Sequence, residues 1–396
     1  MTTFQDFALP EALQHKLDAL GFDKPTPVQE RAIPAALEHR DILGSAQTGT
    51  GKTAAFSIPL LTKIMNHADV YGIIVTPTRE LALQVDEQIR AFLSAKSKIR
   101  SVVLIGGASI ERQVQALGKR PKIVVGTPGR IIDHLERKSL DLSGFNYVVL
   151  DETDRMLDMG FSAPIAEIFS HVSEERQTLL FSATLPKNIQ KISAQYLQNP
   201  VRIEMGQVNS VGDNIVQSTQ FVSKDGKFEM LVDALREHDQ SAIVFMNSKF
   251  ATEKMAKRLK SAGITAEAIH GDLRQSKRER VISNLRDNKF RVLVATDVAA
   301  RGIDVPHIHQ VINFDLPRQT EDYIHRIGRT GRNGAQGIAL NLATRDDMEK
   351  LNDIERLINP NAAKSAHNRP AGKPARKKPQ AKGRWRNKKS NRARAA

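Results

Sequence analysis

The amino-acid sequence predicts an α/β protein in which two parallel-sheet domains follow one another and a disordered basic tail ends the chain. Between residues 41 and 205, short and almost continuously apolar segments alternate with amphipathic helical patterns. A strand that is apolar on both sides is buried on both faces, so this alternation is typical of a parallel sheet covered by helices. The alternation stops at the polar, glycine-containing residues 206–214 and then starts again. We therefore expect two lobes joined by a linker.

The expected elements follow from the apolar pattern. Residues 1–40 are helix-patterned, with a break at the two prolines of residues 21–29. The strands expected in the first lobe are residues 71–75, 101–105, 122–125, 147–150 and 178–181, preceded by a short apolar pair at 42–43. Those expected in the second lobe are residues 219–222, 242–246, 266–269, 292–295, 310–313 and 338–341. The expected domains are 1–205, which includes the segment 1–40, a linker at 206–215, a second domain at 216–360 and a tail at 361–396.

Length and composition exclude several classes of protein. The 396 residues are enough for two domains with cores of their own. The absence of cysteine excludes disulfides, thiol catalysis and metal sites with cysteine ligands. No apolar run reaches the roughly 18 residues of a membrane span, and the first residues lack the basic start of a signal peptide. We therefore expect a cytoplasmic protein with no membrane partner.

The formal net charge of +15 is concentrated in the tail. Residues 361–396 hold 13 of the 59 Lys and Arg residues and no Asp or Glu, which leaves 46 basic against 44 acidic residues elsewhere. The tail also lacks Leu, Ile, Val, Phe, Met and Tyr, so no burial offsets the entropy of ordering it. We expect a disordered electrostatic tether for a polyanion. For Trp385, stacking on a base and an incidental place in a solvated charge run are equally good interpretations.

The stretch AQTGTGKT predicts a phosphate-binding loop between a strand and a helix. Its small residues let successive backbone N–H groups converge on a polyphosphate at a helix N-terminus. Lys52 adds a cation for the β- and γ-phosphates, and Thr53 adds a hydroxyl for Mg²⁺. The alternative is a Gly/Thr-rich surface turn, and the first glycine of the usual pattern is replaced here. The expected nucleotide-binding residues of this loop are Ala46, Gln47, Thr48, Gly49, Thr50, Gly51, Lys52 and Thr53.

Two carboxylates follow the apolar segment 147–150, at the end of a strand where open α/β sheets bind ligands. Asp151 can hold Mg²⁺ through water, and Glu152 can orient or deprotonate the attacking water. An acidic pair after a strand is usually a solvated turn. The phosphate-binding loop in the same lobe favours the functional interpretation.

Ten ordered stretches make the chain similar to the DEAD-box ATP-dependent RNA helicases of superfamily 2. They are GFDKPTPVQ (21–29), AQTGTGKT (46–53), PTRELA (77–82), GG (106–107), TPGR (127–130), DETD (151–154), SAT (182–184), QSKR (275–278), ATDVAARGID (295–304) and HRIGRTGR (325–332). The resemblance runs from Phe4 to about residue 345 and implies two RecA-like domains. It departs from the family signature at Thr153, where the family has alanine.

The resemblance also implies roles around ATP. In the family, a glutamine matching Gln29 reads the adenine edge, and an upstream aromatic, here Phe4, stacks on the ring. An amide suits this role because it carries a donor and an acceptor. For Phe4 the alternative is a hydrophobic anchor for the first helix. Asp304 matches the residue that reaches the ribose.

Further roles implied by the resemblance lie in the second lobe and between the lobes. Arg329 and Arg332 match arginine fingers, which suit the spread charge of a phosphoryl transition state. The alternative for these two is a basic loop that contacts RNA. The residues expected to couple the lobes are Asp154, Ser182, Thr184, His325 and Arg326, the last two as links to Asp154 or SAT.

RNA contacts are expected from the remaining turns, which offer hydroxyls, glycine N–H groups and single arginines rather than a base-reading helix. These residues are Pro77, Thr78, Arg79, Gly106, Gly107, Thr127, Pro128, Gly129, Arg130, residues 270–272, Gln275, Arg278, Thr296 and Arg301. For each of them an ordinary loop cap is an equally good interpretation. Binding is therefore expected to be independent of sequence.

The sequence therefore predicts an RNA helicase that uses RNA-stimulated hydrolysis of ATP, with Mg²⁺, to separate short duplexes or remodel RNA–protein complexes. ATP and RNA together are expected to close the lobes of a monomeric core. The alternatives are an ATP-gated RNA clamp or scaffold, an annealing chaperone that depends on the basic tail, and, less favoured by the motifs, a DNA translocase. The sequence names no target RNA and no protein partner.

Overall fold

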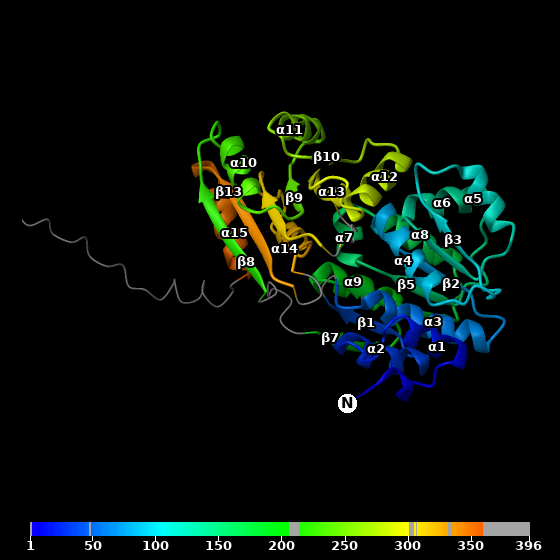
Figure 1. Ribbon diagram of the computed structural model, residues 1–396. Coiled ribbons are helices and arrows are strands. Elements are labelled where there is room, and N and C mark those ends of the chain that lie inside the picture. Colours follow the sequence, from blue (N-terminus) through cyan, green and yellow to red (C-terminus); the bar gives the residue numbers. More distant parts are fainter. Residues whose placement is uncertain are drawn as a thin grey trace, which may run out of the picture.

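The computed structural model consists of two lobes, each built on one parallel sheet (Figure 1). It describes residues 2–46, 49–205, 214–300, 305, 307–331 and 335–358. Two expected segments, the tail at 361–396 and most of the linker, lie outside the described residues. Within the described part, no helix combines the length and hydropathy that a membrane span requires.

The first lobe begins with a short helical segment and then alternates strands with helices. Its helices are η1 (Phe4–Asp6), α1 (Glu11–Ala19), α2 (Pro27–Leu37), α3 (Lys52–Asn66), α4 (Arg79–Ala91), α5 (Ile110–Leu117), α6 (Pro128–Glu136), α7 (Thr153–Asp158), α8 (Ser162–His171) and α9 (Lys187–Tyr196). Its strands are β1 (Ile42–Ser45), β2 (Gly72–Val75), β3 (Ser101–Leu104), β4 (Ile123–Gly126), β5 (Tyr147–Leu150), β6 (Gln177–Ser182) and β7 (Val201–Glu204). They pair in parallel in the order β3-β4-β2-β5-β6-β1-β7.

The second lobe repeats this plan. Its helices are α10 (Lys227–Glu237), α11 (Lys249–Ser261), α12 (Gln275–Arg286), α13 (Asp297–Ala300), α14 (Asp322–Ile327), η3 (Arg345–Asp347) and α15 (Met348–Ile358). Its strands are β8 (Ile215–Phe221), β9 (Ala242–Phe245), β10 (Ala266–Ile269), β11 (Val292–Ala295), β12 (Gln310–Asn313) and β13 (Gly337–Ala343), in the parallel order β10-β11-β9-β12-β13-β8.

The structure confirms the predicted class of two parallel-sheet domains in tandem. Each sheet is buried on both faces, because hydrophobic clusters lie on either side of both sheets. Strands β5, β10, β11 and β12 have the predicted bounds. The differences are at the edges: β7 was not predicted, and β8 begins four residues before the predicted strand. Each of these strands pairs with only one neighbour, so neither has the continuous apolar sequence of an inner strand.

Strand order places the predicted motifs together. Strands β5, β6 and β1 are neighbours, and their carboxyl ends meet at one edge of the first sheet because all three run in parallel. The phosphate loop follows β1, the carboxylate pair follows β5, and residues 183–184 follow β6. Ligands bind at this edge in open α/β sheets.

Candidate functional site

The phosphate loop is held in shape by the segment that precedes α2. Thr26 Oγ1 donates a hydrogen bond to the carbonyl of Thr50 at 2.8 Å, and Gln29 Nε2 donates to the carbonyl of Gly51 at 3.1 Å. Gly51 has φ of +90°, and a Cβ there would lie 2.3 Å from Gln29 Nε2. Only glycine fits this position, both for its backbone conformation and for space.

Lys52 lies at the start of α3 and reaches back over the loop. Its ammonium donates to the carbonyl of Ala46 at 2.8 Å, and the side chain is 6% exposed. Thr53 follows it in the first turn of the helix. Gln47 and Thr48, two further predicted nucleotide-binding residues, lie outside the described residues.

Three buried carboxylates face this loop from the end of β5. Asp151, Glu152 and Asp154 are 2%, 5% and 6% exposed. The pKa of Asp151 is raised to about 6, mainly by burial; the nearby Lys52 ammonium opposes this shift, and the charges of Glu152 and Asp154 add to it. Glu152 occupies the left-handed region with φ of +49°, and its N–H donates to Asp151 Oδ1 at 2.9 Å. A buried carboxylate with a raised pKa at a ligand-binding edge indicates a functional group rather than a solvated turn.

These residues fit a magnesium ion that is held mainly by water and phosphate. The described residues contain no group of three or more His, Asp or Glu side chains placed around a metal. Mg²⁺ bound with a nucleotide does not require one, since it takes one or two protein oxygens and keeps several waters. Asp151 offers such an oxygen at a buried position near the Lys52 ammonium. Bound there, the ion would supply charge neutralisation for the phosphates.

Asp154 ties the start of α7 to the end of β6. Its Oδ2 accepts hydrogen bonds from the N–H groups of Ala183 and Thr184, both at 3.0 Å, and from Thr184 Oγ1 at 3.3 Å. Ser182 Oγ donates to the carbonyl of Thr184 at 2.6 Å. The structure therefore brings together the three coupling residues expected in the first lobe.

Thr153 is completely buried and has two hydrogen-bond partners. Its hydroxyl lies 3.1 Å from the carbonyl oxygen of Phe181 and 3.3 Å from that of Leu150. A single hydroxyl hydrogen donates to either acceptor or is shared between them. The extra polar group is therefore satisfied, at the junction of β5 and β6.

The lobes meet beside these carboxylates. Arg155 Nη1 and Asp322 Oδ1 form an ion pair at 3.0 Å between α7 and α14, which are adjacent in Figure 1. Both side chains are buried. Arg329 lines a small cavity at this junction together with Arg155, Asp322 and His325, and its Nε donates to the carbonyl of His325 at 3.1 Å. Arg332 and Asp304, predicted to reach the γ-phosphate and the ribose, lie outside the described residues.

The position of Arg326 differs from the prediction. We expected a link to Asp154 or SAT, but its guanidinium binds Asp297 at 2.8 Å, Asn313 at 2.9 Å and Asn247 at 3.2 Å, all in the second lobe. A fully buried guanidinium needs partners for its five donors, and the loops around α13 and β12 supply them. Arg326 therefore holds the second lobe together.

Phe4 also differs from the role that the resemblance implied. It is 1% exposed, and its ring packs edge-on against Phe7 and Phe22 at centroid distances of 5.8 and 5.7 Å. An enclosed ring has no open face for a base. The contacts favour the alternative, a hydrophobic anchor for α1.

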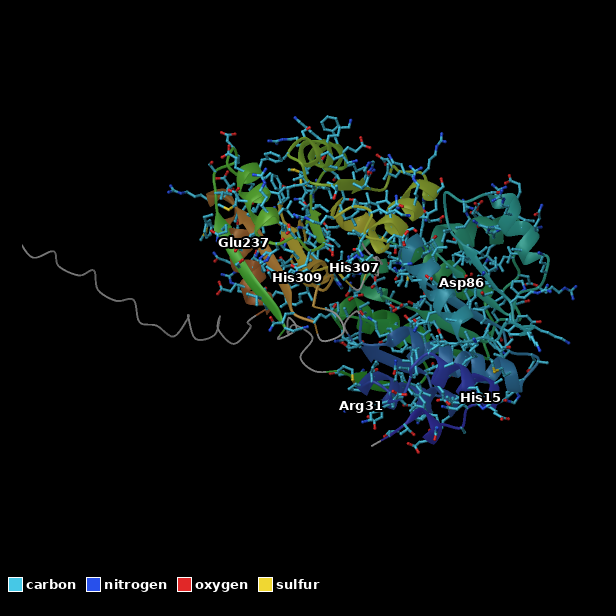
Figure 2. The ribbon with its side chains drawn as sticks, in the orientation of Figure 1. His15, Arg31, Asp86, Glu237, His307 and His309 are labelled. Carbon is cyan, nitrogen blue, oxygen red and sulfur yellow. The ribbon has the colours of Figure 1, made fainter. Side chains whose placement is uncertain are left out.

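On the opposite side of the lobe junction, a groove of about 1270 Å³ runs between α4, β3 and α5 of the first lobe and the start of α12. Arg79, Gly107, Gln275 and Asp272 line it, as does Asp86, which Figure 2 labels. The Arg79 guanidinium lies so close to Gly107 that a Cβ there would be 2.5 Å from Nη1.

Three other residues predicted to contact RNA, Thr78, Gly106 and Arg130, contact elements that line this groove. Thr78 Oγ1 caps α4 by accepting from the N–H of Leu81 at 3.3 Å. Arg130 donates to the carbonyl of Ala108 at 3.3 Å and to Gln113 Oε1 at 3.2 Å, and so joins α6 to α5. Thr127, Pro128 and Gly129 form the start of α6, Gly106 lies against Arg79, and Thr296 lies between β11 and α13. Arg301 lies outside the described residues.

Arg278 has a partner that the sequence did not indicate. Its Nη2 lies 2.8 Å from Glu80 Oε2 of α4, and both side chains are 4% exposed. Desolvation raises the pKa of Glu80, and the Arg278 charge opposes that shift. This ion pair joins the lobes, and the predicted contact of Arg278 with RNA stays a prediction. The contacts of Glu80, Arg155 and Asp322 were not predicted, because one sequence gives no signal for a pairing between distant segments.

Comparison with known families and proteins agrees with the two-domain architecture. The model of the DEAD/DEAH box helicase family matches residues 26–192, and that of the helicase conserved C-terminal domain matches residues 226–334. The DEAD-box ATP-dependent RNA helicase CshA of Geobacillus kaustophilus is 44% identical over 358 residues, which are 90% of this chain and 76% of that protein. CshA of Bacillus cereus is 45% identical over 90% of this chain and 68% of its own length.

Solved structures of DEAD-box proteins are similar over most of the chain. Dbp5 of S. cerevisiae bound to RNA and ADP BeF3 has a TM-score of 0.82 at 31% identity, over 90% of this chain and 94% of that one. Mss116p bound to ssRNA and AMP-PNP has a TM-score of 0.83 at 31% identity, over 90% and 78%. A DEAD box protein of Methanococcus jannaschii is more identical, at 40%, yet has a TM-score of 0.54 over 90% and 97%. Over the whole chain, the structure is therefore more similar to the RNA-bound Dbp5 and Mss116p than to the Methanococcus jannaschii protein.

Proposed function

The chain belongs to the DEAD-box family and is an ATP-dependent RNA helicase, and from this premise we propose how its residues divide the work. The observation that supports the proposal is the meeting of the phosphate loop, the buried carboxylates and the Arg155–Asp322 contact at one edge of the first sheet. An ATP site at this edge borders the second lobe directly.

On the ATP side, Lys52 leaves the carbonyl of Ala46 and binds the β- and γ-phosphates. Thr53 and Asp151 hold the Mg²⁺ that accompanies the nucleotide. Glu152, held by its left-handed backbone at the strand end, orients the attacking water. Arg329, already at the lobe junction, stabilises the transition-state charge together with Arg332.

On the RNA side, the groove between the lobes takes a single strand through its backbone. Arg79, Gly107 and Gln275 supply contacts from both lobes, so the strand is held only while the lobes are together. ATP and RNA then favour the same arrangement, and hydrolysis is coupled to RNA binding. Strand separation follows because a duplex does not fit a groove shaped for one strand.

The rest of the proposal concerns the tail, the domain boundaries, the oligomeric state and the location of the protein. The basic tail, residues 361–396, acts as an electrostatic tether, the division into domains follows the sequence boundaries, and the core works as a monomer in the cytoplasm. If half of the 13 basic residues of the tail contact RNA, deleting the tail should reduce the slope of log affinity against log salt by roughly 4 to 5, because each neutralised phosphate of a single strand contributes about 0.7. An unchanged slope would show that the tail does not touch RNA.

The test measures ATP hydrolysis and strand displacement side by side, with and without RNA. We expect RNA to stimulate hydrolysis and ATP to be required for displacement. Glu152→Gln keeps the size of the side chain, so it is expected to retain ATP and RNA binding and to lose turnover. Arg332→Ala is expected to bind nucleotide and to lose about 10³ to 10⁵ in rate. RNA-stimulated hydrolysis without displacement would identify a clamp or scaffold, and annealing without ATP would identify a chaperone.

A further inference from the structure

The outer face of α11 carries an exposed aromatic ring among lysines. Phe250 is 78% exposed, the highest value among the large hydrophobic side chains of the described residues. Single exposed hydrophobic residues are common and alone indicate nothing. Phe250, however, shares its face with Lys254 and Lys257, which follow it at spacings of four and seven residues.

Packing of α11 directs these three side chains away from the lobe. The helix packs against β10 and β11 through Thr252, Met255, Ala256 and Leu259, which are its buried residues. The opposite face, defined here as the α11 stripe, consists of Phe250, Lys254 and Lys257, and it spans about 10 Å along the helix.

The stripe keeps a positive charge because nearby acidic groups are already paired. Helix α11 has five basic residues and one acidic residue, Glu253, for a formal charge of +4. Glu253 binds His270 at 3.1 Å. Within the described part of the chain, Lys254 and Lys257 take part in no ion pair. Their charge is available to an anionic ligand.

The stripe begins at the rim of the interlobe groove. Lys249, the residue before Phe250, binds Asp272 at 2.6 Å, and its stem passes Gly271. Gly271 and Asp272 both line the groove. A strand that leaves the groove past this loop therefore meets Phe250 first and the two lysines next.

We propose that the α11 stripe is a second contact site for single-stranded RNA, in which a base stacks on Phe250 and the neighbouring phosphates approach Lys254 and Lys257. A ring with free access and cations beside it is the arrangement that sequence-independent single-strand binding uses. The inference rests on the proposed function, since it extends the RNA path assigned to the groove. It gives the helicase a preference for RNA with a single-stranded extension on this side.

The experiment compares two RNA strands on the full-length protein by fluorescence anisotropy. One is the shortest oligouridylate that fully stimulates hydrolysis, and the other is the same strand extended by several uridines at either end. Wild type is expected to bind one extended strand at least fivefold more tightly than the short strand, because a stacked base contributes about 1–3 kcal/mol. Phe250→Ala is expected to lose this gain, and Phe250→Trp is expected to keep it.

A matched control is Phe221→Ala, since Phe221 is also exposed, at 55%, but lies on the edge strand β8. It is expected to bind both strands as wild type does. The Lys254→Gln/Lys257→Gln double variant is expected to reduce the salt slope for the extended strand by up to about 1.4.

The outcomes separate this inference from the function on which it rests. A wild type whose hydrolysis RNA does not stimulate would contradict the proposed function. Normal stimulation, together with a gain on extension that Phe250→Ala retains, would overturn only the stripe. A loss of equal size for the short and the extended strand would also overturn it, because Phe250 would then belong to the groove.

Discussion

The two edges of the first sheet both bury charged side chains, but only one of them leaves those charges short of partners. At the carboxyl edge, burial raises the pKa of Asp151 to about 6, and Lys52 contacts only a loop carbonyl among its neighbours in the described structure. At the amino edge, Lys63 binds His39 at 2.9 Å and also Gln177, and Asp41 accepts from the N–H groups of Thr178 and Gln198 at 2.7 and 2.6 Å.

The difference shows that buried charge alone does not identify a functional site. Both edges shift pKa values, since burial also lowers the pKa of Lys63 to about 8. The amino edge uses its charges to fasten α2, α3 and β6 together. The carboxyl edge instead places a glycine-containing loop beside a strand end that carries buried carboxylates. Variants at the two edges should therefore affect different quantities.

The largest expected effect is at the carboxyl edge. Lys52→Ala removes the cation that binds the phosphates, so RNA-stimulated ATP hydrolysis should nearly disappear. The free energy of unfolding should change little, because the lost hydrogen bond is to a single carbonyl. A coupled ATPase assay and urea denaturation measure the two quantities. Full RNA-stimulated turnover in this variant would remove Lys52 from the phosphate site.

The amino edge should show the reverse. Asp41→Asn keeps the shape of the side chain but offers one acceptor oxygen where two N–H groups now bind. One buried N–H loses its partner, so we expect the free energy of unfolding to fall by about 1–3 kcal/mol. Turnover at a temperature where the variant is folded should stay near the wild-type value. A selective loss of turnover in Asp41→Asn would contradict the separation of the two edges.

Lys63 should make the free energy of unfolding depend on pH. Its pKa is about 8 in the folded protein against an ordinary 10.5, so between these values the unfolded chain binds more protons. The free energy of unfolding should therefore rise as the pH increases from 8 to 10.5. Lys63→Met lacks the titrating group, and the rise relative to wild type should be absent from it. Denaturation curves of both proteins across this pH range provide the test.

Sequence alone predicted the inner strands and the motif residues of the carboxyl edge because both leave local signals. Continuous apolar runs mark the inner strands β5 and β11, and glycine spacing marks the phosphate loop. Edge strand β7 leaves a weaker signal, with charged residues at Arg202 and Glu204.

Contacts between distant segments leave no local signal at all. Arg155 and Asp322 are 167 positions apart. Neither the ion pair of Arg278 with Glu80 nor the burial of Phe4 follows from spacing, since each depends on where other elements pack. The family resemblance predicted that Arg278 contacts RNA and that Phe4 stacks on adenine. A motif indicates a role for a residue, but it does not show which side chains that residue contacts in the fold.

The smallest expected effect concerns Thr153, the position that the sequence motifs predict to differ from the family signature. The hydroxyl joins the ends of β5 and β6, so it fastens the Asp151–Glu152 turn to the loop that holds Ser182 and Thr184. Thr153→Ala removes this bond but leaves both carboxylates, and hydrolysis should stay within about tenfold of wild type, or about 1.4 kcal/mol in the barrier. We expect the loss to fall on coupling, measured as duplexes displaced per ATP hydrolysed.

Two further variants separate the hydroxyl from the volume of the side chain. Thr153→Ser keeps the donor and should restore coupling, whereas Thr153→Val keeps the shape, buries no donor and should resemble alanine. If Thr153 has only a structural role, coupling should fall in step with the free energy of unfolding in all three variants. Coupling and the free energy of unfolding are therefore both measured. A wild type without ATPase activity that Thr153→Ala restores would show the natural threonine to be disabling, and the scaffold function would then replace the helicase. If the Thr153→Ser, Thr153→Val and Thr153→Ala variants displaced equal numbers of duplexes per ATP hydrolysed, the hydrogen bond between β5 and β6 would support only the fold. Position 153 would then behave like the residues of the amino edge, although it lies at the carboxyl edge.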